Sequence, residues 1–148
     1  MCSPVSEPVE QVTAEDAAAH AERLLAADAA TRTLGIVLSD VCPGRATATL
    51  TVTAAMVQGH GTCHGGYLFL LADTAFAFAS NSRGVPTVAA GADIEFLLPA
   101  GEGDVLVAAA AERVLRGRGG IYDVTVRRGS DVVCEFRGRS RALRAAAG

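Results

Sequence analysis

Threonines alternate with small or branched apolar residues over residues 45–53, Arg-Ala-Thr-Ala-Thr-Leu-Thr-Val-Thr, and this is the clearest strand signal in the chain. A period of two places the apolar side chains on one face of a strand and the threonines on the other. The apolar set is Ala46, Ala48, Leu50 and Val52. Pro43-Gly44 separates this segment from residues 34–42, which also have strand character, so a hairpin is predicted.

Residues 65–79 follow a different pattern, because they are almost wholly apolar over a length that suits a helix. Winding them at 100° per residue distributes the large side chains around the full circumference, which predicts a helix enclosed by other elements. Those side chains are Leu68, Phe69, Leu70, Leu71, Phe76 and Phe78. The helix is predicted over about residues 65–81, because Asn81-Ser-Arg-Gly84 is a typical helix terminator.

Four further segments with strand character follow, at roughly residues 86–98, 103–116, 120–128 and 131–142. The short turn-forming stretches between them favour antiparallel neighbours over crossovers. Residues 105–111 are rich in alanine, so helical propensity competes with the strand assignment there.

The N-terminal part of the chain is predicted to be a tail followed by a helix. Residues 1–12 contain two prolines and scattered acids, which is typical of a flexible tail, and Thr13 and Asp16 then have the spacing of a capping box. The alanine-rich helix that they begin is predicted to reach about Ala30. Since 148 residues, half of them hydrophobic, supply one core, residues 13–148 are predicted to form a single domain. Its class is α+β, with an antiparallel sheet of about five to six strands wrapped around the central helix.

Composition excludes several partners and compartments. The formal charge of -3 gives no general attraction to nucleic acid or to an anionic membrane surface. The apolar run at 65–79 is too short to span a bilayer comfortably. The four cysteines are widely spaced, without a CxxC pair, and the N-terminus lacks the pattern of a secretory signal, so a reduced, cytoplasmic protein is expected.

Asp73 is the only charged residue in the predicted central helix, and it is the first candidate for chemistry. Burying an ionised carboxylate without partners costs several kcal/mol even after relaxation, so such a group is usually paired or functional. A structural carboxylate bonded to backbone or hydroxyl groups is the alternative. Because residues 66–79 offer no arginine or lysine, the partners of Asp73 must come from elsewhere, or from water and substrate.

The segment His64-Gly65-Gly66 begins the predicted helix and would present free backbone N–H groups at the positive end of its dipole. Such donors suit a thioester carbonyl that becomes an oxyanion, although two glycines can also simply permit a tight turn. His64 can orient the substrate or brace the loop. Gln58 can orient water, fix the turn or lie at the surface, and Thr74 can donate to a ligand or to the preceding helical turn.

Two other arrangements around this loop have weaker support. Cys63 and His64 are adjacent, and neighbouring side chains in an extended loop point apart, which favours a structural cysteine over a catalytic dyad. A metal site built from His60, Cys63, His64 and Asp73 has no recognised ligand spacing.

Helical rise separates Gly65 from Asp73 by roughly 12 Å, since they are eight residues apart. One small acyl group cannot contact both, because a reacting carbonyl needs its donor and its base each at about 3 Å. If both act on one carbonyl, they must come from different subunits. Two such helices packed antiparallel about a twofold axis would give two equivalent sites per dimer.

Arginines gather near the end of the chain. Arg137 and Arg139 share one face of the last predicted strand, and Arg116 and Arg118 lie in the neighbouring hairpin. They are either ordinary solvated surface or a cradle for a polyphosphate such as that of coenzyme A, with glycines such as Gly120 and Gly138 allowing a nucleotide close to the backbone.

These residues resemble the hotdog-fold thioesterases, in particular the phenylacetic-acid-degradation (PaaI) type. The match lies in residues 60–81, in Pro86-Thr-Val-Ala-Ala-Gly91 and in Phe136-Arg-Gly-Arg-Ser140, and it covers about residues 34–143. The resemblance implies a helix wrapped by an antiparallel sheet, dimers that join into a homotetramer, a site at the dimer interface, and no metal or other cofactor.

The resemblance also implies roles for individual residues. Asp73 would be the general base or nucleophile, the Gly65 N–H would polarise the thioester carbonyl, and His64 would assist from the loop. The position of Gln58 holds asparagine in many similar chains. The N-terminal helix lies outside the specific match, and no function is assigned to it.

The expected function is therefore hydrolysis of an acyl-CoA thioester, such as phenylacetyl-CoA or hydroxyphenylacetyl-CoA, to the free acid and CoA. Asp73, Gly65, His64, Gln58 and Thr74 are the catalytic candidates, and Gly66 with the four arginines are the candidates for substrate binding. One alternative is a hotdog hydratase or dehydratase that uses His64 and Asp73 on an acyl thioester. Another is an acyl-CoA-binding module without turnover.

Overall fold

The computed structural model describes residues 11–144, and it contains three α-helices, a short 3-10 turn and one six-stranded sheet within that range. The helices are α1 (Ala14–Ala27), α2 (Ala29–Thr33) and α3 (Gly65–Ser80). The strands are β1 (Val37–Cys42), β2 (Arg45–Thr51), β3 (Thr87–Phe96), β4 (Val105–Arg116), β5 (Gly119–Arg128) and β6 (Asp131–Ala142). The predicted tail at residues 1–12 lies almost wholly outside the described residues.

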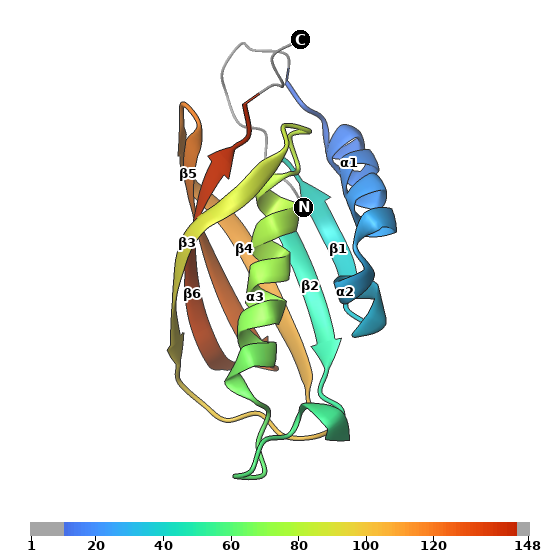
Figure 1. Cartoon of the computed structure of the whole chain (residues 1–148), viewed down its shortest axis with the longest axis vertical. Helices are drawn as coiled ribbons and strands as arrows, with labels where there is room; N and C mark the ends of the chain where they lie inside the picture. The colour runs from blue at the N-terminus through green and yellow to red at the C-terminus, as the bar shows by residue number, and fades with distance from the viewer. Residues whose placement is uncertain (1–10, 145–148) are drawn as a thin grey trace.

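The sheet is entirely antiparallel and curves around α3, as the resemblance to the hotdog fold implied (Figure 1). Its strand order is β1-β2-β4-β5-β6-β3. The predicted β1–β2 hairpin is confirmed, and Gly44 adopts the left-handed conformation that its turn requires. The alanine-rich residues at the start of β4 form a strand, because pairing with β2 on one side and β5 on the other overrides their helical propensity.

One prediction about connectivity is wrong. The turn at residues 97–104 does not join neighbouring strands, because β3 pairs with β6 at the sheet edge while β4 lies between β2 and β5. This order leaves β3 as one edge of the sheet and β1 as the other. Because α1 packs against β1, the two edges have different surroundings within the described chain (Figure 1).

The core lies between α3 and the concave face of the sheet. The four apolar residues of the β2 alternation are buried there as predicted, and Thr51 faces solvent. Phe76 of α3 lies across β6, and the Gly138 backbone comes so close to its ring that a Cβ at that position would lie 2.8 Å from it. Gly138 therefore serves core packing, and the prediction that it leaves room for a nucleotide is wrong.

The N-terminal helix ends earlier than predicted. The capping box of Thr13 and Asp16 is present, but α1 stops at Ala27 and Asp28 begins α2 as its N-cap. The carboxylate of Asp28 accepts hydrogen bonds from the Thr31 N–H at 3.0 Å and the Thr31 hydroxyl at 2.6 Å. Because aspartate stabilises a helix start better than a helix interior, a new helix begins here and the chain turns.

The central helix is less enclosed than predicted. A stripe along α3 remains partly open to solvent, and its spacing is that of one helical face. The stripe consists of Gly66, Phe69, Leu70, Asp73 and Ala77, with Asn81 just beyond the helix. Across residues 11–144, no helix combines the length and apolar character needed to span a membrane.

Candidate active site

Asp73 lies in the middle of α3, half-buried on the open stripe. Among residues 11–144, no side chain or backbone group donates a hydrogen bond or forms an ion pair to its carboxylate. Burial raises the pKa of this carboxyl group above its ordinary value, since removal from water disfavours the charged form. A partly buried acid without a partner, which still reaches a pocket, is typical of a catalytic group.

The carboxylate of Asp73 lies in a pocket of about 570 Å³, which is within the range of small-molecule sites. Three parts of the fold form its walls: the elbow between α1 and α2, the second half of α3, and the start of β3. The α3 residues besides Asp73 are Phe76, Ala77, Ser80 and Asn81, and the β3 residues are Thr87, Val88 and Ala89. Phe76 and Ala77 supply apolar surface one helical turn beyond the carboxylate.

The pocket's hydroxyl and amide groups donate their hydrogen bonds within the protein. Ser80 donates to Ala77 O, and the Asn81 amide nitrogen donates to Ala77 O and to Thr87 O. The Thr87 hydroxyl donates to Val85 O. These bonds fix the α3–β3 junction, and the side chains can still accept hydrogen bonds. The described part of the pocket lining therefore offers no free side-chain donor of this kind.

The start of α3 has one free backbone donor. Gly65 N–H has no acceptor among the described residues, whereas Gly66 N–H donates to His64 Nδ1 at 2.8 Å. The first N–H of a helix points along the axis at the positive end of the dipole, which suits an anionic oxygen. The ring of Phe96 lies against Gly65, where a Cβ would approach it to 3.1 Å.

His64 is the N-cap residue of α3, and its imidazole is part of the helix start. Because Nδ1 accepts from Gly66, the neutral ring carries its hydrogen on Nε2, which can donate to a ligand. The same bond occupies the Gly66 N–H that was predicted to bind substrate. The role of Gly66 stays a prediction, and the unoccupied donor beside it is Gly65.

Gln58 fixes the loop that precedes α3. Its side-chain nitrogen donates to the Thr62 hydroxyl at 2.8 Å, and its side-chain oxygen accepts from the His60 N–H at 2.6 Å. An isolated bridge between Val57 and Cys63 closes the base of this loop. Both ends of the amide are therefore engaged in holding the glycine turn, one of the roles predicted for this residue.

Thr74 and Cys63 lie away from the pocket. The Thr74 hydroxyl is buried and donates to Leu70 O at 2.7 Å, within the helix. Cys63 is buried too, and desolvation raises the pKa of its thiol, while the adjacent imidazole is bonded to Gly66. This arrangement supports a structural cysteine. Within the described residues, no group of three or more His, Cys, Asp and Glu side chains could hold a metal ion.

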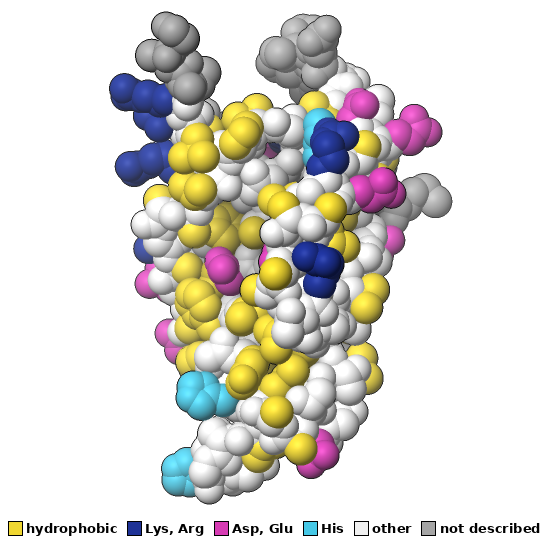
Figure 2. All heavy atoms as spheres, turned by 45° about the vertical axis from the view of Figure 1, so that its right-hand side comes forward, with side chains coloured by type: hydrophobic (Ala, Val, Ile, Leu, Met, Phe, Trp, Pro, Cys, Tyr) yellow, Lys and Arg dark blue, Asp and Glu magenta, His cyan; other side chains and the backbone are white. Residues whose placement is uncertain are grey.

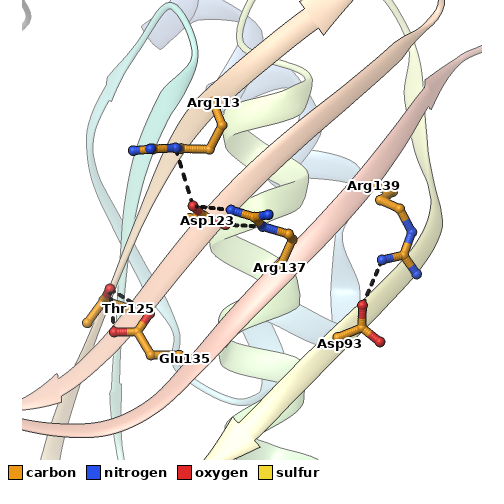
Figure 3. A network of polar contacts seen from close by, with 7 residues as sticks. All are labelled: Asp93, Arg113, Asp123, Thr125, Glu135, Arg137 and Arg139. Carbon is orange, nitrogen blue, oxygen red and sulfur yellow. Dashed lines mark hydrogen bonds and ion pairs between the residues drawn. The ribbon is translucent and has the colours of Figure 1, made fainter.

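The predicted arginine cradle divides into paired and unpaired cations. On the outer face of the sheet, Arg137 forms a bidentate pair with Asp123 at 2.6 and 2.9 Å, and Arg139 contacts Asp93 at 2.7 Å (Figure 3). Arg113 approaches the same Asp123 at 3.3 Å. A guanidinium that already holds a carboxylate has less charge to offer a phosphate, so these pairs reduce the case for Arg137 and Arg139.

Arg116 and Arg118 remain the better candidates for a polyphosphate. Arg118 donates from Nε to Ala142 O, which leaves its terminal nitrogens available, and Arg116 has no partner among the described residues. Both lie at the β4–β5 turn, where Gly119 pairs with Arg141 of β6. Arg141 in turn pairs with Val88, a residue of the pocket wall, so these cations belong to the end of the sheet that carries the pocket.

The elbow between α1 and α2 is the part of the site that the sequence did not reveal. Leu24, Ala27, Asp28, Ala29 and Ala30 line the pocket. Asp28 followed three residues later by Thr31 is a typical helix N-cap pattern. This pattern could have predicted that a second helix begins here. No local pattern indicates that this break lies beside Asp73, some 45 residues further along the chain.

Comparison with known proteins agrees with this fold. Residues 60–135, which include the His64–Gly66 helix start and Asp73, match the model of the thioesterase superfamily. The chain belongs to that family, with the hotdog fold.

Two relatives illustrate the likeness. The chain is 45% identical over 117 residues to the acyl-coenzyme A thioesterase PaaI of Escherichia coli K12, which covers 78% of this chain and 84% of the relative. The structure of E. coli PaaI superimposes with a TM-score of 0.88, covering 90% of this chain and 97% of that one. A mutant structure of the phenylacetic acid degradation protein PaaI from Thermus thermophilus is 38% identical, with a TM-score of 0.76 over 78% of this chain and all of that one.

Proposed function

We propose that this chain hydrolyses acyl-CoA thioesters to a free acid and CoA, with Asp73 as general base or nucleophile. The observation that carries the proposal is the unpartnered, half-buried carboxylate of Asp73 in a pocket of substrate size. The 45% identity to an acyl-coenzyme A thioesterase supports the choice of thioester. The names of the relatives favour an aryl-acetyl group, phenylacetyl or hydroxyphenylacetyl, within phenylacetic acid degradation.

The two catalytic routes share their first requirement, an oxyanion donor. In the general-base route, Asp73 takes a proton from water, the water oxygen attacks the thioester carbon, and the carbon–sulfur bond breaks. The departing thiolate receives the proton, and Asp73 is regenerated. In the nucleophilic route, a carboxylate oxygen attacks the carbon, releases CoA and leaves an acyl anhydride on Asp73, which water then cleaves. In either route the Gly65 N–H would stabilise the negative oxygen.

Gly65 and Asp73 lie on one helix, eight residues and roughly 12 Å apart, so their joint action on one thioester carbonyl requires two subunits. We propose a homodimer in which β3 pairs with the partner's β3. An edge strand of ten residues with an exposed phenylalanine at its end is a ready pairing surface, and Leu97 and Leu98 extend its apolar character. Two such dimers would form a homotetramer in a cytoplasmic setting.

The proposal is tested by release of free thiol from a panel of CoA thioesters. We expect turnover of phenylacetyl-CoA or hydroxyphenylacetyl-CoA by the wild type and its loss in Asp73→Ala and Asp73→Asn. Glu102→Gln is the control, since it changes an exposed carboxylate that does not line the pocket. If folded Asp73 variants retain wild-type turnover, the catalytic assignment fails.

The shared site has its own experiment. Inactive Asp73→Ala and Gly65→Pro chains are mixed, and each heterodimer is expected to regain one working site, since one chain retains the carboxylate and the other the donor. Proven heterodimers without activity would contradict a site shared between subunits.

Isotope labelling separates the two routes. Single-turnover hydrolysis in oxygen-18 water would place label in the Asp73 carboxylate only if an acyl anhydride forms and water attacks the Asp73 carbonyl. Label only in the product acid, combined with no trappable acyl-enzyme, is the result expected for a general base.

A further inference from the structure

The elbow between α1 and α2 forms the pocket wall contributed by the N-terminal part of the chain. Leu24 and Ala27 end α1, Asp28 turns the chain, and Ala29 and Ala30 begin α2. Three of these five residues are alanines, which occupy little space. Figure 2 shows this side of the molecule, where hydrophobic side chains are frequent and acidic side chains are interspersed.

The elbow is held firmly enough to act as a wall. Ala17 of α1 is fully buried, and Leu24 and Leu25 pack against the main core. His20 lies so close to Gly84 that a Cβ at position 84 would come within 2.5 Å of its ring, and Gly84 also has a positive φ of 80°. The α1 helix is thereby seated directly on the turn that links α3 to β3, which are the other two walls of the pocket.

The elbow also gives the pocket a charge. Among residues 11–144, its lining contains two carboxylates, Asp28 and Asp73, and no arginine or histidine. The hydrogen-bond donors of Ser80, Asn81 and Thr87 are used within the protein. A carboxylate at the end of a ligand would find no cation and no free side-chain donor there, and it would be repelled by both acids.

We propose that the α1–α2 elbow determines which acyl groups the enzyme accepts. Ala27 and Ala30 leave space for a bulky apolar acyl group beyond Asp73, and Asp28 excludes acyl groups that end in a carboxylate. Asp28 has this role in addition to capping α2. The inference rests on the proposed thioesterase function and adds the residues that select the substrate.

The size of the acyl group is tested with Ala27→Leu, using Ala26→Leu as the matched control. Both positions are exposed on α1 and tolerate leucine in a helix, but only Ala27 lines the pocket. In Ala27→Leu, we expect kcat/KM for phenylacetyl-CoA to fall roughly tenfold relative to acetyl-CoA, because a pocket mismatch of a few methyl groups has effects of that order. The ratio should stay at the wild-type value in Ala26→Leu. Equal ratios in both variants would overturn the role of the elbow.

The charge of the acyl group is tested with Asp28→Asn, because asparagine is an equally good N-cap residue. Glu22→Gln is the control, since it removes the same charge from an exposed α1 position outside the pocket. We expect kcat/KM for succinyl-CoA relative to butyryl-CoA to rise roughly fivefold in Asp28→Asn alone, the factor that corresponds to one screened like-charge contact. If this kcat/KM ratio does not change, or changes equally in both variants, the proposal that Asp28 excludes acyl groups ending in a carboxylate is wrong.

A binding measurement separates this inference from the proposed function. If the wild type hydrolyses none of the thioesters, the function is wrong, and calorimetry with a phenylacetyl-CoA thioether analogue then tests the elbow alone. Weaker binding in Ala27→Leu than in Ala26→Leu would still support the elbow as the acyl wall. Indistinguishable binding would reject it.

Discussion

Asp73 and Glu112 are both carboxylates withdrawn from solvent, and their surroundings are opposite. Glu112 on β4 accepts hydrogen bonds from Arg83 at 3.0 Å and from the Tyr122 hydroxyl at 2.9 Å. Asp73 on α3 has no partner among the described residues. The hydrogen bonds of Glu112 connect β4 with β5 and with the turn after α3. Within residues 11–144, Asp73 forms no such bond, and it lies in a pocket.

The pKa shifts of Asp73 and of Tyr122, which lies beside Glu112, agree with this contrast. Burial raises the pKa of the Asp73 carboxyl, and no cation among residues 11–144 compensates for it. Burial and the adjacent Glu112 carboxylate raise the pKa of Tyr122 well above its ordinary value, so this phenol remains a donor to Glu112. A carboxylate with partners contributes to the fold, while a carboxylate without them costs stability and is available to substrate.

The largest expected effect is on catalysis. Asp73→Asn keeps the size of the side chain but removes the base or nucleophile, and kcat/KM should fall roughly 10²- to 10⁴-fold. Glu112→Gln should leave kcat/KM per folded molecule within about threefold, because Glu112 does not line the pocket. Steady-state kinetics on both variants decides the point. A comparable loss of kcat/KM in Glu112→Gln would contradict the view that Asp73 is catalytic and Glu112 structural.

The second effect is on stability, and it falls on the other carboxylate. Glu112→Gln weakens the pair with Arg83 and should lower the free energy of unfolding by about 2 kcal/mol, since Arg83 is left partly buried without its counter-charge. Urea denaturation with an unchanged m-value would measure this. Arg137→Gln breaks a more exposed ion pair and should lower the free energy of unfolding less than Glu112→Gln does, which makes it the control.

The sequence predicted a special role for Asp73, but it did not predict that Glu112 is paired. Asp73 could be found because no other charge occurs in its apolar helix, so a local pattern revealed it. Glu112 lies in a strand among ordinary surface-like charges, and its partners come from 29 residues before it and 10 residues after it. Such contacts depend on strand pairing, which the predicted strands did not specify.

The fold shows the same division between local and distant information. Period-two alternation located β2, and the cap spacing located the start of α1. The edge position of β3 and the packing of the elbow beside Asp73 both depend on the order of strands in the sheet. The turn residues between β3 and β4 favoured an antiparallel hairpin, but these strands are not neighbours in the sheet. Turn residues indicate where the chain reverses and do not determine which strands pair.

The third effect concerns the hydrogen bond that the Tyr122 hydroxyl donates to Glu112. Tyr122→Phe removes one hydrogen bond but leaves Arg83 in place, so the free energy of unfolding should fall by about 1 kcal/mol. The ring still packs against Phe76, at a centroid distance of 5.4 Å, which isolates the contribution of the hydroxyl. In the Glu112→Gln background the same substitution should cost less, and a double-mutant cycle measures that coupling. Full additivity would mean that the hydroxyl acts independently of Glu112.

The smallest effect concerns the stability cost of Asp73 and has a defined pH dependence. Because the folded pKa lies above the unfolded value of 3.8, the folded protein binds the proton more tightly, and stability falls as pH rises through the range between the two values. Below that range both states are protonated and the cost is absent; above it the full cost remains. Asp73→Asn should therefore unfold at a higher temperature than the wild type at pH 7, and the difference should shrink as pH falls toward 4. Thermal unfolding of both proteins across this range measures the difference. A constant difference would place the benefit of asparagine in packing, and a lower Tm at pH 7 would show that the Asp73 carboxylate has a stabilising partner after all.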